Sequence, residues 1–200
     1  NNIRDISLWA LLVKNKTMKY LKKIIVIIPI FLYSCASSPY LKTYEPLTIF
    51  LKQEKMDISK TYYLQSEKID TKNVISDFKD YKSSGPYFDS IFKAIPYHNE
   101  KEFKKMSNKY INDTIKKYWK KDDFVNFNFI IKKSEELTND SLQNKNKIYI
   151  SEPLYFWKKK YLIFNFYILN YGGGITKLVF MKKENNLWKV DKVISSDVYF

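Results

Sequence analysis

The hydrophobic pattern of the chain changes its period near the middle, and this change limits the folds open to it. Up to about residue 120, apolar residues recur at helical spacing, as they do in segment 86–95. Beyond that point apolar and polar residues alternate, as they do in segment 125–131. The order predicts an α+β fold, in which N-terminal helices pack on a C-terminal antiparallel β-meander sheet.

Two helices are predicted in the first half. Segment 86–95 follows Gly85 and ends before Pro96, and its apolar residues share one face. A longer helix is predicted from Glu100 to Lys120, with a break near Asn112–Asp113; Asn99 offers an N-cap, and Glu102 stands at the capping-box spacing. Segments 46–53 and 60–66 contain short apolar runs without a clear period.

The second half predicts strands joined by tight turns. Strands are expected at 125–131, 147–150, 161–169, 177–182 and 187–194. Segment 161–169 is apolar on both faces, which is typical of a central strand. A glycine-rich turn at 172–174 and a second turn at 184–186 connect the last three strands into a meander.

The segment from Met18 to Cys35 has the organisation of an export signal. Lysines 19, 22 and 23 precede a nine-residue apolar run, 24–32, which has the length of a signal-peptide core. A membrane-spanning helix needs about 20 apolar residues, so this run is too short to serve as a stable transmembrane anchor.

The residues that close this segment resemble the lipobox of bacterial lipoproteins. Leu32, Ser34 and Cys35 match its pattern, whereas Tyr33 is bulkier than the usual residue, and Cys35 is the only cysteine in the chain. The resemblance implies that Cys35 becomes the first mature residue and carries acyl chains. The alternative is a buried core cysteine. Two or more acyl chains hold a protein on a bilayer stably.

The sequence therefore predicts four regions. Residues 1–17 are an upstream extension, or else part of a longer leader that uses apolar segment 8–13; 18–34 are the lipoprotein signal peptide; 35–45 are a flexible tether; and 46–200 form a single α+β domain. No aspartate follows Cys35, so the retention signal known from some inner-membrane lipoproteins is absent and an outer-membrane location is favoured.

Composition excludes several classes of protein. One cysteine and one histidine, His98, rule out an internal disulfide and the common zinc sites within one chain. The net charge of +14 suggests an anionic partner, but only +9 remains after residues 1–34 are removed. The single arginine, Arg4, lies within those residues, so nucleic-acid binding is not expected. No cofactor is predicted.

The C-terminal half also resembles a group of small uncharacterised bacterial lipoproteins. The likeness rests on segment 150–154, the hydrophobic strand after it, the glycine-rich turn, and segment 182–190. Members of that group often carry two cysteines in the turn, which segment 169–175 lacks. The group implies no activity.

Candidate catalytic groups are few. His98 has no nucleophile motif beside it, and the glycine run at 172–174 precedes a strand, whereas phosphate-binding glycine loops precede a helix. The neighbouring carboxylates Asp122–Asp123 and Glu135–Glu136 point apart on a strand or helix. The aromatic surplus could line a sugar or lipid cavity, although core packing is commoner, and the lysines in 101–121 could contact anionic head groups.

The function predicted from the sequence is a lipid-anchored extracytoplasmic lipoprotein of the cell envelope, with no catalytic residues assigned. Its partners would be the bilayer, through acylated Cys35, and an envelope protein or ligand. The domain is expected to be a non-catalytic binding or structural module; the alternative is an extracytoplasmic hydrolase whose catalytic residues are not recognised.

Overall fold

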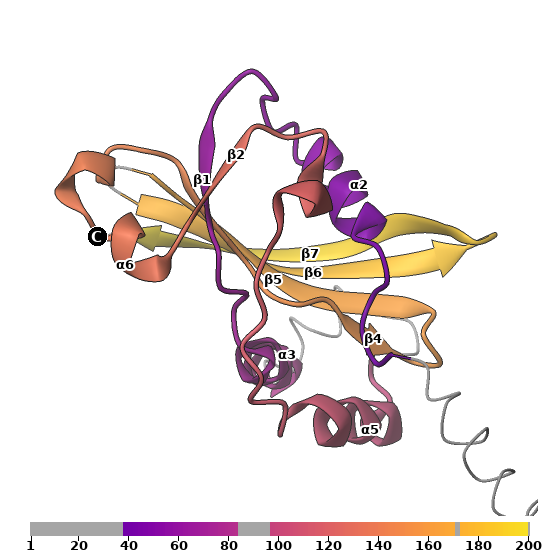
Figure 1. The fold of residues 1–200 in the computed structure, drawn as a ribbon. Coiled ribbons are helices and arrows are strands. Elements are labelled where there is room, and N and C mark those ends of the chain that lie inside the picture. The colour runs from indigo at the N-terminus through magenta and orange to yellow at the C-terminus, as the bar shows by residue number, and fades with distance from the viewer. Residues whose placement is uncertain (1–37, 84–96, 171–172, 200) are drawn as a thin grey trace, which may run out of the picture. The chain divides into compact units, whose positions relative to one another are not determined.

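The computed structural model describes residues 38–83, 97–170 and 173–199, and Pro39–Phe200 form one compact unit. The predicted helix 86–95, the signal peptide and Cys35 lie outside the described residues. Figure 1 shows the order of the elements along the chain. The elements are α2 (Glu45–Gln53), β1 (Tyr62–Gln65), α3 (Thr71–Ser83), α5 (Glu100–Tyr110), η1 (Lys121–Phe124), β2 (Phe129–Lys132), α6 (Ser134–Leu137), η2 (Asp140–Leu142), β3 (Lys147–Ile150), β4 (Leu154–Phe156), β5 (Tyr161–Asn170), β6 (Gly173–Glu184) and β7 (Leu187–Tyr199).

The described strands form one sheet of seven, with the order β2-β1-β3-β5-β6-β7 and with β4 also paired to β5. β1 runs parallel to β2 and β3, and the other pairs are antiparallel. The α+β class predicted from the sequence is confirmed, but the sheet is not wholly antiparallel as expected, because β1 pairs in parallel with β2 and β3. The meander of β5, β6 and β7 was also predicted, although β6 and β7 are longer than expected.

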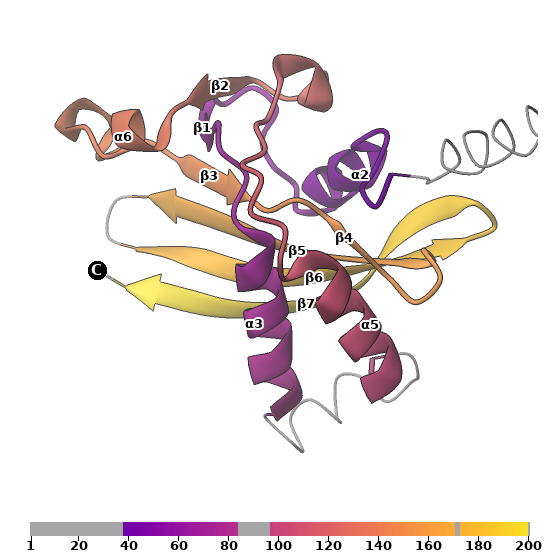
Figure 2. The ribbon, with the colours of Figure 1, turned by 60° about the horizontal axis from the view of Figure 1, so that its bottom comes forward.

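Helices contact both faces of the sheet, α2 on one and α3 with α5 on the other (Figures 1 and 2). On the α2 face, the ring of Phe50 meets Phe164 and Phe166 edge-on at 5.3 and 5.2 Å. On the α3 face, the buried ring of Phe78 lies 5.3 Å from Phe180. Phe50 and Phe78 each belong to a group of apolar residues spaced three or four positions apart on one side of their helix. Each packs against strand residues that point to the face of the sheet that the helix covers.

The tight turns follow local backbone chemistry. Asn185 and Asn186 have φ angles of 49° and 64°, as a two-residue hairpin turn requires, and they join β6 to β7. Gly174 lies opposite Leu169, where an added Cβ would come within 2.4 Å of the leucine Cδ2 and 2.5 Å of the Ile168 carbonyl oxygen. β6 begins at Gly173 and pairs Gly173 with Asn170, so two of the three glycines predicted as a turn at 172–174 belong to the strand. The glycine run leads into a strand and not into a helix, as the hairpin interpretation predicted.

The helix predicted over 100–120 is too long by ten residues. Asn99 caps α5 by accepting from the Glu102 amide at 3.1 Å, as predicted, but the helix ends at Tyr110, close to the predicted break near Asn112–Asp113, and does not resume. Beyond it the chain is extended and pairs with the segment after β1: the Trp119 amide donates to Ser66 O at 2.8 Å, and the Lys68 amide donates to Lys117 O at 2.9 Å. The hydrogen bonds to the segment after β1 therefore keep this part of the chain extended, although its apolar residues recur at helical spacing.

The strand predicted over 125–131 begins only at Phe129. Asp122 and Asp123 lie in the 3₁₀ helix η1, where the Asp123 carboxylate accepts from the Lys120 amide at 2.8 Å. This local cap holds a turn in place of the expected strand start, and Val125 is 81% exposed.

The packed unit begins earlier than the predicted boundary at residue 46. The Tyr110 hydroxyl donates to Pro39 O at 2.7 Å, and Tyr40, Leu41 and Tyr44 pack against the two cores. The part of the predicted 35–45 tether from Pro39 onward therefore belongs to the folded unit.

Candidate functional site

A row of side chains crosses the α3 face of the sheet beside this helix. Tyr149 of β3 stands opposite Tyr167 of β5, Tyr167 opposite Thr176 of β6, and Thr176 opposite Ser196 of β7. We call these four residues the tyrosine row. Because directly opposed residues share a face of the sheet, the row presents two aromatic rings followed by two hydroxyls.

Above the row lies a cavity of about 530 Å³. Tyr149, Tyr167 and Thr176 line it from the sheet; the remaining lining residues are Gln65, Lys68, Ile69, Asp70, Asn73 and Leu169. Its volume falls in the range of small-molecule sites, which are concave and combine apolar surface with a few polar groups.

A polar network beneath the row holds Tyr167 in place. The Asn165 amide nitrogen donates to Asp77 Oδ2 at 2.7 Å and to the Tyr167 hydroxyl oxygen at 3.1 Å, and that hydroxyl donates to Asp77 Oδ2 at 3.3 Å. Asn165 is 1% exposed, and its amide oxygen has no hydrogen-bond partner among the residues that the structure describes. Burial, followed by the nearby Asp77 carboxylate, raises the pKa of Tyr167 to about 12. The hydroxyl is therefore protonated at neutral pH.

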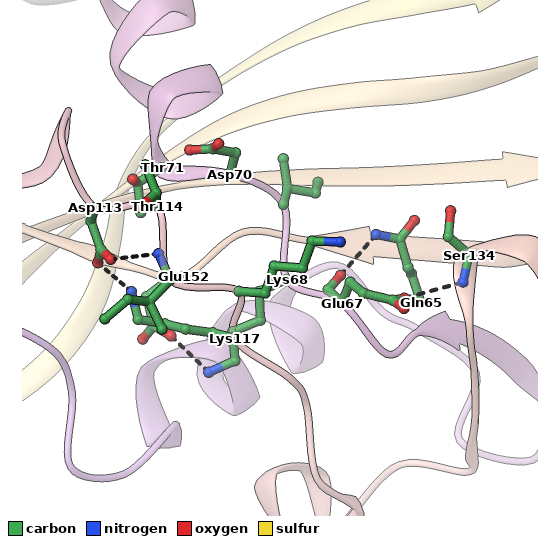
Figure 3. A pocket seen from close by; sticks show the side chains of 13 residues that line it. Gln65, Glu67, Lys68, Asp70, Thr71, Asp113, Thr114, Lys117, Ser134 and Glu152 are labelled. Carbon is green, nitrogen blue, oxygen red and sulfur yellow. Dashed lines mark hydrogen bonds and ion pairs between the residues drawn. The ribbon is translucent and has the colours of Figure 1, made fainter.

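A second cavity of about 330 Å³ adjoins the first along the segment from Lys68 to Asp70 (Figure 3). Most of the residues that line it are polar; the lining residues are Gln65, Glu67, Lys68, Ile69, Asp70, Thr71, Asp113, Thr114, Ile115, Lys116, Lys117, Ser134 and Glu152. Figure 3 shows Lys68 between a group that contains Asp113 and Glu152 and another that contains Glu67 and Ser134.

A buried ion pair lies beside this second cavity. Lys68 Nζ is 2.7 Å from Glu152 Oε2, and the two side chains are 5% and 2% exposed. The Lys68 ammonium lies 4.2 Å from the ring centroid of Tyr44 and 4.1 Å from that of Trp119, and it also bonds the Tyr44 hydroxyl oxygen. Burial lowers the pKa of Lys68, and the charge of Glu152 opposes that change.

Tyr44 completes the charge compensation. Its hydroxyl donates to Glu152 Oε1 at 3.1 Å, and burial, reinforced by Glu152, raises the pKa of Tyr44. The hydroxyl therefore keeps its proton and serves as a donor. Both carboxylate oxygens of Glu152 thus have donors, which is the condition under which a buried charge is tolerated.

The break between β3 and β4 places Glu152 at the pair. Both strands run along β5, but Pro153 has no amide hydrogen to continue the ladder. Ser151 substitutes: its hydroxyl accepts from the Asn165 amide at 2.9 Å, while its own amide donates to Asn165 O at 3.0 Å. The irregular backbone that follows carries the carboxylate of Glu152 toward Lys68.

The other carboxylates beside the second cavity are also held by donors. Asp113 accepts from the Ile115 amide at 3.2 Å and from Lys117 Nζ. Glu67 accepts from the Ser134 amide at 3.1 Å, and although burial opposes it, this bond helps to lower the pKa of Glu67. A general acid needs a raised pKa, so Glu67 is suited to holding structure or ligand and not to donating a proton.

The candidate residues taken from the sequence lie elsewhere. His98 is exposed just before α5 and lines neither cavity. Glu136 accepts from the Lys133 amide at 3.0 Å at the start of α6, and Glu135 pairs with Lys133 at 3.8 Å. These acidic pairs cap short helices and do not converge on a cavity.

The sequence analysis missed the tyrosine row and its network. One signal was present: Asn165 interrupts an otherwise apolar segment, Ile163–Tyr167, that was correctly predicted as a central strand. A polar side chain at a fully buried strand position needs partners, and those partners are Asp77 and Tyr167.

Comparison with known proteins adds no assignment, since no family model, curated protein or solved structure matches the chain. Within residues 38–83, 97–170 and 173–199, no group of three or more histidine, cysteine, aspartate or glutamate side chains is placed to hold a metal ion. In the same ranges, no helix has the length and apolar character needed to cross a membrane.

The Asp77 carboxyl should make the stability of the folded protein depend on pH. Burial raises the pKa of Asp77 above its usual value near 3.9, although the bonds from Asn165 and Tyr167 oppose the shift. The folded state then binds the Asp77 proton more tightly than the unfolded state does. We expect the unfolding free energy of the wild type, relative to Asp77→Asn, to be highest in acid and to fall as the pH rises toward neutral.

Urea denaturation of both proteins across the range from acid to neutral pH measures this difference. Asp140→Asn, at an exposed position of η2 whose charge does not act on Asp77, controls for the loss of a carboxylate. A difference that grew with pH would mean that Asn165 and Tyr167 stabilise the charged form, contrary to our account.

Proposed function

We propose that this protein is an extracytoplasmic lipoprotein, anchored by acylated Cys35, whose α+β unit binds a small ligand and performs no catalysis. The anchor is supported by the sequence from Met18 to Cys35, in which the only cysteine of the chain follows a basic and apolar leader. In this proposal the helices of the N-terminal half and the C-terminal meander form the scaffold of the binding site.

The ligand that the tyrosine row fits best is a neutral sugar. Sugar rings have an apolar face that packs on aromatic side chains and hydroxyls that need hydrogen-bond partners. Tyr149 and Tyr167 supply the aromatic surface, and Gln65, Asn73 and Thr176 supply amide and hydroxyl groups around the same 530 Å³ cavity. This juxtaposition is the observation that carries the ligand assignment.

The non-catalytic role is supported by the state of the charged groups. Glu152 is neutralised by Lys68 and Tyr44, and Asp113 by Lys117. The observation that favours the alternative, a hydrolase, is the presence of Glu67, Asp113 and Glu152 beside one cavity. A glycosidase needs two carboxyl groups free to act on a substrate, one of them protonated.

The anchor predicts a covalent product. A strain that expresses the full chain and is fed a radiolabelled fatty acid should label the wild type and not Cys35→Ser, because no other residue of the chain supplies a cysteine thiol for the thioether. The variant should also keep its leader and migrate as a larger species. Label retained on Cys35→Ser would contradict the anchor.

The ligand site predicts binding without turnover. Cellobiose, titrated into the mature protein in nanodiscs and followed by NMR, should bind about tenfold more weakly to Tyr149→Leu, since one stacking surface is lost. Tyr118→Leu is the matched control, because that tyrosine is 54% exposed and lines neither cavity. Equal binding by both variants would refute the site, and the appearance of glucose would favour the hydrolase.

A further inference from the structure

The folded unit meets the preceding chain beside a strongly basic surface. Pro39 O accepts from the Tyr110 hydroxyl at 2.7 Å, and the same hydroxyl accepts from the Tyr155 amide at 3.3 Å. Tyr110 is the last residue of α5, and Tyr155 lies in β4. Pro39 therefore lies where the end of α5 meets β4.

We call the surface formed by Lys105 and Lys109 of α5 with Trp157, Lys158 and Lys159 of the β4–β5 turn the basic surface. These five residues surround a cavity of about 270 Å³, together with Met106, Tyr155, Phe156 and the carboxylate of Glu102. Glu102 is bonded by Lys105 at 2.6 Å.

Two features of the basic surface are unfavourable for the free energy of the folded state: the closeness of its lysines and the backbone conformation of its turn. Burial, followed by the nearby charge of Lys159, lowers the pKa of Lys109. Trp157, Lys158 and Lys159 have φ angles of 42°, 52° and 61°, a left-handed conformation that residues with a Cβ adopt unfavourably. Strained backbone persists where the surrounding structure enforces it, and it is concentrated at functional sites.

The covalent tether fixes how far this surface can lie from an anchored cysteine. Four peptide links join Cys35 to Pro39. Fully extended, they span about 14 Å, at most 3.6 Å for each residue. The screening length at physiological ionic strength is about 8 Å. The tether therefore keeps the lysines beside Pro39 near the bilayer and allows them to come within one screening length of its charge.

We propose that the basic surface docks on anionic lipid head groups of the bilayer that holds Cys35; this inference rests on the proposed lipid anchor. The lysines bind the phosphate groups, and Trp157 lies at the level of the head groups, where tryptophan is favoured. Docking orients the folded unit on the membrane. The sequence analysis considered the lysines in 101–121 as possible contacts for anionic head groups. Two of them, Lys105 and Lys109, belong to the basic surface, which also includes residues of the β4–β5 turn.

Quenching of tryptophan fluorescence by brominated lipid tests the docking on the full lipidated chain. The protein is incorporated into vesicles of brominated phosphatidylcholine, alone or mixed equally with brominated phosphatidylglycerol. We expect quenching of Trp157 in the mixed vesicles only, with Trp157→Phe used to subtract the signal of Trp119 and Trp188, which are 4% and 9% exposed. Salt near 1 M, with a screening length of about 3 Å, should abolish it.

We expect the docked form to be disfavoured about 100-fold, roughly fivefold for each lysine, in a triple variant that combines Lys109→Gln, Lys158→Gln and Lys159→Gln. A control removes the same charge elsewhere, through Lys60→Gln, Lys121→Gln and Lys145→Gln, all exposed and outside the basic surface. The control should quench like the wild type.

Three results would overturn the docking: equal quenching in both kinds of vesicle, full quenching of the triple variant, or loss of quenching on adding inorganic phosphate at constant ionic strength, which would indicate a small-anion site. A failure of the proposed lipid anchor would give a different result, which vesicle flotation detects. A chain without acyl groups would not float with vesicles of phosphatidylcholine alone, whereas an anchored chain that does not dock would float with them and remain unquenched.

Discussion

The buried pair of Lys68 and Glu152 is the interaction on which the arrangement of this protein depends. Each ion would lose several kcal/mol of solvation if it were buried alone, so the two must meet. They come from segments 84 residues apart, one after β1 and one after β3, and Tyr44 and Trp119 add contacts from two further segments. One charged contact therefore ties four parts of the chain together at the same place.

The shape of both cavities depends on this ion pair. The segment from Lys68 to Asp70 lines the polar cavity and also the cavity above the tyrosine row, so the pair that holds Lys68 positions a wall common to both. The Ser151–Pro153 irregularity serves two purposes: it directs Glu152 to Lys68, and it bonds the backbone of Asn165, whose side chain supports Tyr167. The ion pair and the proposed sugar site are thus linked through one turn of backbone.

What the sequence predicted and what it missed have a common physical basis. The meander and the Asn99 cap depend on residues a few positions apart, and these were predicted correctly. The continuation of the helix beyond the expected break near Asn112–Asp113 to Lys120 was wrong, because Trp119 pairs with Ser66, a partner 53 residues away. The tyrosine row was missed for the same reason, since its residues become neighbours only through the register of four strands. The parallel strand β1 gave no pattern strong enough to identify it.

The most direct measurement is a double-mutant cycle on the ion pair, with unfolding free energies from urea denaturation of wild type, Lys68→Met, Glu152→Gln and the double variant. Each single change leaves a buried polar or charged group without its partner and should cost about 3–5 kcal/mol. The double variant removes both charges together, so our account predicts that it costs no more than either single change. If the two single costs simply added in the double variant, the pair would not be the contact that organises this fold.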